Sequence, residues 1–409
     1  MGSGDASVAL QVPGAGRPAA AELLARARAL AAELAPGAAE HDRSGTFAQA
    51  HVDAVWRAGL GNLTLPASLG GPGADLRTTV AAVRLLAAGD PSTALVLVMH
   101  LAHLRVVVDP ASGFPPALRE RIVADGLAGP ALINALRVEP DLGTPARGGV
   151  PATTARPAAG DGGEPGWRVR GRKVFSTGAP GLHWLLVWGA TSADAPGGQR
   201  VGWLVVPGGS PGVTIEPTWD HLGMRATGSH DVVLDGVWIP EHHAVGLQAP
   251  GGPGRGRDVV LVGWLTTLLL AVYRGVAQAA RDWLVRYLGE RVPSNLGAPL
   301  ASLPRMQEAV GEIEAHLYTA DRVLDALAGG LDRGGADAAR AAEEQGVAKA
   351  VVTRALVESV SLAVGLVGNA GLTHHHPLQR HYRDVLCSRI HTPQDDASLL
   401  AAGRAALLP

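Results

Sequence analysis

Apolar residues recur along the chain with two different spacings, and the changes of spacing divide it into three parts. Up to Gly126 the spacing is helical and predicts helices over residues 19–34, 46–59, 76–88 and 92–108. From about Gly129 the period falls to two, which predicts strands over residues 131–138, 153–156, 167–177, 184–190, 201–206, 213–217 and 229–238. After Ala249 helical spacing returns and predicts helices over residues 259–288, 304–329, 336–367, 377–389 and 393–408.

These three parts predict an α+β protein. We expect an N-terminal all-α domain over residues 1–128, a central antiparallel β-barrel or sandwich domain over residues 129–250, and a C-terminal four-helix bundle over residues 251–409. A chain of 409 residues is too long for one ordinary core. Its hydrophobic content of 47% is enough to supply several cores.

The stretch GRKVFSTGAPGLHW, residues 171–184, reads as a strand, a turn of small residues and a second strand. We interpret it as a hairpin that can press against a flat ligand. Gly178 and Gly181 allow the backbone to approach such a ligand closely, and Ser176 and Thr177 offer hydrogen bonds.

Charge and composition narrow the class of partner. The net charge of −2 has no basic block behind it, which argues against nucleic acid and anionic membranes and favours a small molecule. The single cysteine, Cys387, excludes an internal disulfide and a multi-cysteine metal site, and no metal site is expected at the consecutive residues 374–376, all histidine. No secretory signal opens the chain, and the apolar run 259–272 is shorter than a membrane span, so we expect a cytoplasmic protein.

Three further motifs carry a family resemblance: VEPDLGTP at residues 138–145, HLGMRATGSHDVVLDGVWIP at 221–240 and RHYRD at 380–384. With them, residues 20–408 resemble the acyl-CoA dehydrogenase superfamily. The resemblance implies an acyl-CoA dehydrogenase-like fold, a flavin held between the β domain and the bundle, and a homotetramer with flavin sites shared between subunits. Glu139, in the first motif, is expected to order the flavin-side loop and not to act as a base.

The resemblance also assigns flavin-binding residues. Phe175 corresponds to the residue that stacks on the isoalloxazine, with Ser176 beside it and Thr177 near N5. Positions that contact the pyrophosphate and adenine end across a subunit interface correspond to Arg291, Gln307, Gly368 and Asn369. Because the loop after Arg291 is longer than the family pattern, FMN, or a weakly held FAD used as a diffusible reduced cofactor, is expected.

The chain departs from the dehydrogenases where their chemistry takes place. Dehydrogenation of an acyl thioester needs a carboxylate to remove the α-proton. Alignment through the Arg-Asp pair of RHYRD puts His391 at the family's tyrosine and Thr392 at its glutamate. The alternative glutamate on the first bundle helix and the arginine that anchors CoA are replaced by Leu265 and Thr266. The implied pocket, suited to a compact hydrophobic or aromatic substrate, is lined by His103, Trp264, Leu265, Leu268 and Thr392.

One branch of the superfamily shares this combination, the two-component flavin monooxygenases similar to dibenzothiophene monooxygenase and the amino-sugar N-oxygenases. There a partner flavin reductase supplies reduced flavin, and O2 gives a C4a-hydroperoxyflavin supported by two histidines and a hydroxyl, which correspond to His100, His391 and Thr177. Whether His100 or His103 faces the flavin stays open, as does the oxygenated atom: carbon, nitrogen or sulfur. The alternatives are a dehydrogenase or oxidase with Asp395 as an unusual base, and a non-catalytic relative.

Overall fold

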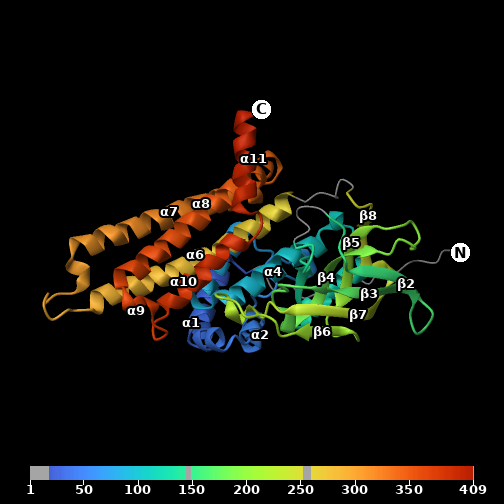
Figure 1. The fold of residues 1–409 in the computed structure, drawn as a ribbon, viewed down its shortest axis with the longest axis horizontal. Helices are drawn as coiled ribbons and strands as arrows, with labels where there is room; N and C mark the ends of the chain where they lie inside the picture. Colours follow the sequence, from blue (N-terminus) through green and yellow to red (C-terminus); the bar gives the residue numbers. More distant parts are fainter. Residues whose placement is uncertain (1–17, 144–148, 252–258, 409) are drawn as a thin grey trace.

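The computed structural model describes residues 18–143, 149–251 and 259–408. Figure 1 shows the strands gathered at one end of the molecule and the long helices α6 (Val259–Glu290), α7 (Pro304–Arg333) and α8 (Gly335–Val367) at the other. The helix α4 (Pro91–Val108) lies between the two groups. The rest of the chain, including the start of the first predicted domain and the end of the VEPDLGTP motif, lies outside the described residues.

The N-terminal helices are, besides α4, α1 (Ala20–Ser44), α2 (Gln49–Arg57), α3 (Leu76–Gly89) and α5 (Pro116–Ala128). The prediction that the first helix ends at residue 34 is wrong, because α1 continues through Pro36 to Ser44. Leu34 and Ala38 belong to one buried stripe on either side of the proline. This tertiary packing outweighs the backbone hydrogen bond that the proline removes.

The central region is a mostly antiparallel sheet. Its described strands are β1 (Leu132–Leu136), β2 (Thr154–Ala159), β3 (Pro165–Lys173), β4 (Leu182–Thr191), β5 (Val201–Pro207), β6 (Val213–Glu216), β7 (Asp231–Pro240) and β8 (Ala244–Gln248). Hydrogen bonds join them in the order β6-β7-β3-β2-β4-β5-β8, and β1 pairs with β4. The β1–β4 and β2–β4 pairs are parallel. Among the described strands, β6 and β8 are the edges of this sheet and do not pair with each other.

The hairpin predicted at residues 171–184 is wrong. β3 pairs with β2 and β7, and β4 pairs with β1, β2 and β5, so β2 lies between the two strands that the turn connects. A period of two identifies a strand but not its partner. The glycines also serve a different purpose: a Cβ on Gly178 would lie 3.2 Å from Val96, and one on Gly181 would lie 3.0 Å from the ring of Phe47. Their close approach is to the protein's own helical region and not to a ligand.

The first and third predicted domains share one hydrophobic core. Leu30 and Leu86 of the N-terminal helices belong to the same buried cluster as Leu268 and Leu356 of the bundle. The sheet has a separate cluster, to which α4 contributes Val96. Because α4 packs on both sides, it fixes the sheet against the bundle.

The bundle ends in α9 (Asn369–Leu372), α10 (Leu378–Leu386), the short 3₁₀ segment η8 (Cys387–Ile390) and α11 (Asp395–Leu407). As predicted, the acids Asp395 and Asp396 lie in the first turn of the last helix. They favour that position because the helix dipole leaves partial positive charge there.

Three helices are long and apolar enough to cross a membrane: Pro91–Val108, Leu261–Glu290 and Gly335–Val367. The expectation that the apolar run of the first bundle helix is too short for a span is therefore wrong. In the first two of these helices, however, 78% and 72% of the apolar window is buried inside the protein. Their apolar surface is covered by neighbouring helices.

Candidate active site

Phe175 lies in the loop that follows β3. It exposes 62% of its surface and has a left-handed backbone with a φ of 56°. Both properties are unusual for a bulky aromatic residue. The conformation is held by the Ser176 N–H, which donates to the His230 carbonyl at 3.1 Å, and by the Thr177 N–H, which donates to the Phe175 carbonyl at 3.0 Å. A strained backbone that keeps an aromatic ring exposed is typical of a ligand platform.

The exposed ring lines a pocket of about 300 Å³, the lower end of the range for small-molecule sites. Trp219 forms a second aromatic wall, with its ring edge-on to Phe175 and the centroids 6.4 Å apart. The remaining lining residues are Val138, Glu139, Pro140, Gly143, Val174, Thr218, Ser229 and Asp231. Aromatic walls with a polar border fit a planar heteroaromatic ring such as an isoalloxazine.

Glu139 orders the loop beside this pocket, as the sequence predicts. Its Oε1 accepts from Lys173 Nζ at 2.6 Å and from Thr153 Oγ1 at 2.6 Å, and its Oε2 accepts from the Ala152 N–H at 2.7 Å. Burial works to raise the pKa of Glu139, but the hydrogen bonds from Lys173 and Thr153 outweigh it and hold that pKa below its ordinary value. Glu139 is therefore a fixed carboxylate and a poor proton acceptor.

The hydroxyl of Thr177 belongs to a chain of hydrogen bonds that ends on the bundle. Ser229 Oγ donates to Thr177 Oγ1 at 3.1 Å, and Thr227 Oγ1 lies 2.8 Å from Ser229 Oγ. Thr227 Oγ1 also donates to the Met224 carbonyl at 2.9 Å, and the Met224 N–H donates to Asp384 Oδ1 at 2.7 Å. Ser176, by contrast, is buried, and its Oγ has no hydrogen-bond partner in the described part of the chain.

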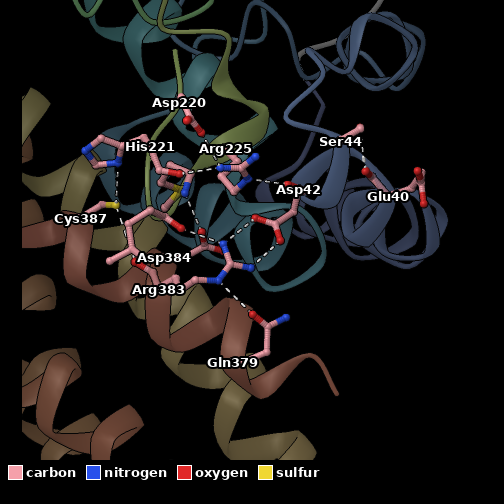
Figure 2. Close-up of polar contacts among 12 residues, drawn as sticks. Glu40, Asp42, Ser44, Asp220, His221, Arg225, Gln379, Arg383, Asp384 and Cys387 are labelled. Carbon is pink, nitrogen blue, oxygen red and sulfur yellow. Dashed lines mark hydrogen bonds and ion pairs between the residues drawn. The ribbon is translucent and has the colours of Figure 1, made fainter. Parts of the chain in front are cut away.

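Figure 2 shows the junction where α1, the loop before β7 and α10 meet. Arg383 forms an ion pair with Asp42 at 2.5 Å and donates to the Leu222 carbonyl at 2.8 Å. Asp384 follows it and is buried. Burial raises the pKa of Asp384 to about 6, and the nearby negative charge of Asp42 adds to the rise.

Asp384→Asn is expected to make the protein more stable at pH 8 and to give about half of that gain at pH 5. Between pH 4 and 6 the folded chain keeps a proton on Asp384 that the unfolded chain releases, so this group lowers stability as the pH rises through that window. The gain at pH 8 is on the order of 1–3 kcal/mol, since asparagine still accepts from the Met224 N–H. Urea unfolding at both pH values measures it, and a variant less stable than the parent at pH 8 contradicts it. Asp42→Asn, which unpairs Arg383, is the control and loses stability at both pH values.

A second cavity lies between α6, α8 and η8. It measures about 10 Å³, room for a single water, and is lined by Thr266, Leu269, Leu270, Tyr273, Lys349, Ser388, His391 and Thr392. The structure thus brings together Thr392, which the alignment puts at the family's glutamate, and His391, which it puts at the family's tyrosine. Thr266, one of the two positions that correspond to the alternative glutamate and the CoA-anchoring arginine, lines the same cavity. No aspartate or glutamate occurs among these lining residues.

His391 is a neutral hydrogen-bond donor in this cavity. Burial, with a smaller effect of the Lys349 charge, lowers the pKa of His391 from 6.5 to about 4. Burial also raises the pKa of Tyr273, so its hydroxyl stays protonated, and we assign it as the donor to His391 Nε2, which lies 2.5 Å away. A neutral imidazole that accepts at Nε2 carries its proton on Nδ1.

The other two candidate histidines lie on α4. His100 is buried, accepts from the Ile133 N–H at Nδ1 over 3.1 Å and packs on Trp56 with ring centroids 5.1 Å apart. Burial lowers the pKa of His100 to about 3. His103 is half-buried, its Nδ1–H donates to the Met99 carbonyl at 2.7 Å, and burial lowers its pKa to about 4. Neither lines the two pockets described above.

The predicted substrate-pocket residues on α6 lie in different surroundings in the structure. Trp264 and Leu265 are half-buried at the edge of the main core, and the Arg105 guanidinium lies 5.7 Å from the Trp264 ring. Leu268 is fully buried in that core. Thr266 donates to Gln345 Oε1 at 3.0 Å and so ties α6 to α8.

The residues predicted for the pyrophosphate and adenine end lie far from Phe175 within one chain. Arg291 follows the end of α6, Gln307 lies in the first turn of α7, and Gly368 and Asn369 join α8 to α9. Figure 1 shows α9 and the connection from α6 to α7 at the end of the bundle remote from the sheet. One chain does not bring these residues to the aromatic pocket.

Sequence reasoning misses Trp219, Tyr273 and Lys349. The first two give no signal in the sequence, because each lies within an ordinary apolar or family-like pattern. Lys349 does give one: the chain contains only two lysines, Lys173 and Lys349, against many arginines. Both are buried and both are ion-paired, Lys173 with Glu139 and Lys349 with Asp395.

The three parts of the chain match three domains of known proteins. Residues 18–112 match the N-terminal domain of acyl-CoA dehydrogenases, residues 138–237 the middle domain and residues 268–395 the C-terminal domain. A putative acyl-CoA dehydrogenase, YdbM of Bacillus subtilis (strain 168), is 36% identical over 90% of this chain and 92% of its own. L-evernosamine nitrososynthase of a Micromonospora species is 33% identical over 85% of this chain and 80% of its own. The structure of KijD3 in complex with FMN and a dTDP-linked amino sugar superposes with a TM-score of 0.82 at 31% identity, covering 96% of this chain and 95% of that chain.

Fold and site together define a flavin-dependent oxidoreductase. Helical regions flank a mostly antiparallel sheet, the pocket beside Phe175 fits a planar ring, and similar proteins bind flavin. The chain belongs to the acyl-CoA dehydrogenase superfamily, and its relatives include the oxygenase branch as well as dehydrogenases.

Proposed function

We propose that the chain is a flavin-dependent monooxygenase that takes reduced flavin from a partner reductase and uses O2 to oxygenate a small hydrophobic or aromatic substrate. The observation that carries the proposal is the cavity around His391, which has no carboxylate among its lining residues. A neutral imidazole with a pKa of about 4, a cationic lysine and a tyrosine above its ordinary pKa are poor bases for an α-proton.

The roles of the residues follow from their geometry. Reduced flavin supplies two electrons and two hydrogens, so that one atom of O2 enters the substrate and the other leaves as water. Phe175 and Trp219 hold the ring, with the Thr177 hydroxyl at its edge. The Nδ1–H of His391 donates to the oxygen that gains negative charge, and Tyr273 keeps that tautomer in place. Leu269 and Leu270 keep water out of the cavity.

We extend the proposal to the assembly. Arg291, Gln307, Gly368 and Asn369 serve the flavin of a neighbouring copy in a homotetramer, since they lie away from the aromatic pocket of their own chain. Two of the three apolar helices have more than 70% of their apolar window buried within the fold, and the net charge is −2. Both support a cytoplasmic enzyme without a nucleic-acid or membrane partner.

A dehydrogenase is the second candidate, favoured by the 36% identity to a putative acyl-CoA dehydrogenase. Its base is Asp395, the carboxylate nearest the cavity in sequence. Asp395 Oδ1, however, accepts from Lys349 Nζ at 3.0 Å, and Asp395 does not line the cavity.

The decisive test supplies reduced FMN and isotopically labelled O2 with dibenzothiophene, indole and a dTDP-linked amino sugar as probes. We expect one labelled oxygen atom in a product of at least one probe, detected by mass spectrometry. We also expect butyryl-CoA, added without oxygen, to leave the bound oxidised flavin unbleached. Bleaching by the thioester, with no label in any product, establishes the dehydrogenase instead.

A further inference from the structure

Lys349 is a buried cation beside the proposed catalytic cavity. It exposes 2% of its surface, although it lies on α8 among alanines and valines. An isolated buried ammonium is costly, and a structural basic residue in this arginine-rich chain would be expected at the surface. Its only hydrogen bond in the described part of the chain goes to Asp395 Oδ1, at 3.0 Å.

The ion pair fixes the segment that carries His391. Asp395 lies four residues after His391, in the first turn of α11, and α11 has no fully buried residue of its own. On the other side of the segment, His391 accepts from Tyr273. A Cβ on Gly346 would lie 2.7 Å from Ser398 Oγ, so α11 also crosses close to α8 one turn before Lys349. The turn is thus held at both ends, by α6 at His391 and by α8 at Asp395.

The charge of Lys349 acts on the same imidazole. The titratable or charged groups that face His391 are Tyr273 from α6, Lys349 from α8 and, through its ion pair, Asp395 from α11. Lys349 lowers the pKa of His391 beyond the effect of burial. Asp395 opposes this effect, since its negative charge lies against the ammonium.

We propose that Lys349 is a positioning residue for His391: its ion pair with Asp395 fixes the turn that carries His391, and its ammonium lines the same cavity as the imidazole and repels a second positive charge there. This inference rests on the proposed function only for the catalytic use of the imidazole. The two effects of Lys349 are separable, because removing either member of the ion pair frees the turn, whereas only removal of Lys349 takes a positive charge from the imidazole.

The test is the pKa of His391, read by NMR titration of labelled histidine in the folded protein and assigned with His391→Gln. We expect Lys349→Met to raise that pKa by about one unit or more, and Lys349→Arg to keep it near the parent value. We expect Asp395→Asn, the matched control, to raise it less than Lys349→Met does, because this variant also frees the turn but keeps the positive charge beside the imidazole.

If the pKa of His391 rises equally in Lys349→Met and Asp395→Asn, the ion pair has only a structural role and the charge role is overturned. No change in Lys349→Met overturns the inference altogether. Should Lys349→Met not fold, Lys349→Gln takes its place in the same comparison, since it also removes the positive charge. The titration needs neither flavin nor substrate, so failure of the oxygenase function in the labelling assay is distinguished from failure of this inference.

Discussion

Replacement of His391 by alanine is expected to lower the rate of substrate oxygenation about 100-fold, with flavin affinity changed less than about threefold. The loss follows from removing one fixed donor at the oxygen that gains charge, an effect of this size in other active sites. Flavin affinity is spared because His391 lines the cavity between α6 and η8 and not the pocket beside Phe175. Turnover with reduced FMN and a flavin titration by fluorescence measure the two quantities separately.

The pH dependence and a control variant sharpen this prediction. Because the pKa of His391 is about 4, its charge state does not change the rate between pH 8 and pH 5, whereas a histidine with a pKa of 6.5 would make the rate change around that value. Tyr273→Phe keeps the ring packing, removes the hydrogen bond to Nε2 and is expected to cost about tenfold, the effect of one lost orienting hydrogen bond. A His391→Ala enzyme with normal turnover removes His391 from the reaction.

The sequence predicts the elements of this fold better than their pairing. The helical and strand-like parts are where the spacing puts them, because burial on one face imposes a period that the sequence records. The hairpin at residues 171–184 is wrong, because the insertion of β2 between β3 and β4 depends on long-range contacts. The extension of α1 past Pro36 is missed for the same reason, since the buried stripe that stabilises it belongs to the tertiary structure.

The candidate site is likewise predicted only in part. Alignment by motif selects His391, Thr392 and Thr266, and these three residues line one cavity, where the segment after η8 meets α6. Tyr273 and Lys349 are missed because they act through contacts between α6, α8 and η8 that no motif records. The protonation state of His391 could not be inferred either, since burial, which the sequence does not show, sets it.

Lys173→Met is expected to destabilise the protein by about 3–5 kcal/mol, the cost of breaking a buried ion pair by removing one partner. Lys173 is fully buried, and its ammonium donates to Glu139 at 2.6 Å and to the Trp188 carbonyl at 2.5 Å. In the variant, the buried carboxylate of Glu139 accepts hydrogen bonds only from neutral donors. Urea unfolding, followed by the fluorescence of the sheet tryptophans, measures the loss.

Arg170→Met is the matched control, three residues earlier on the same strand. Arg170 pairs with Asp235 at 2.7 Å, but both side chains are more than 70% exposed, so the loss is expected to stay below about 1 kcal/mol. The double variant Lys173→Met, Glu139→Gln is expected to recover part of the stability, since it no longer buries an unpaired charge.

Flavin affinity distinguishes a local role of the ion pair from a global one. Because Glu139 orders the loop beside the Phe175 pocket, we expect Lys173→Met to weaken flavin binding even where the protein is fully folded, and Arg170→Met not to weaken it. If Lys173→Met and Arg170→Met are equally stable, the buried ion pair does not contribute the expected stability. If flavin affinity is unchanged in Lys173→Met, the ion pair does not support the flavin pocket.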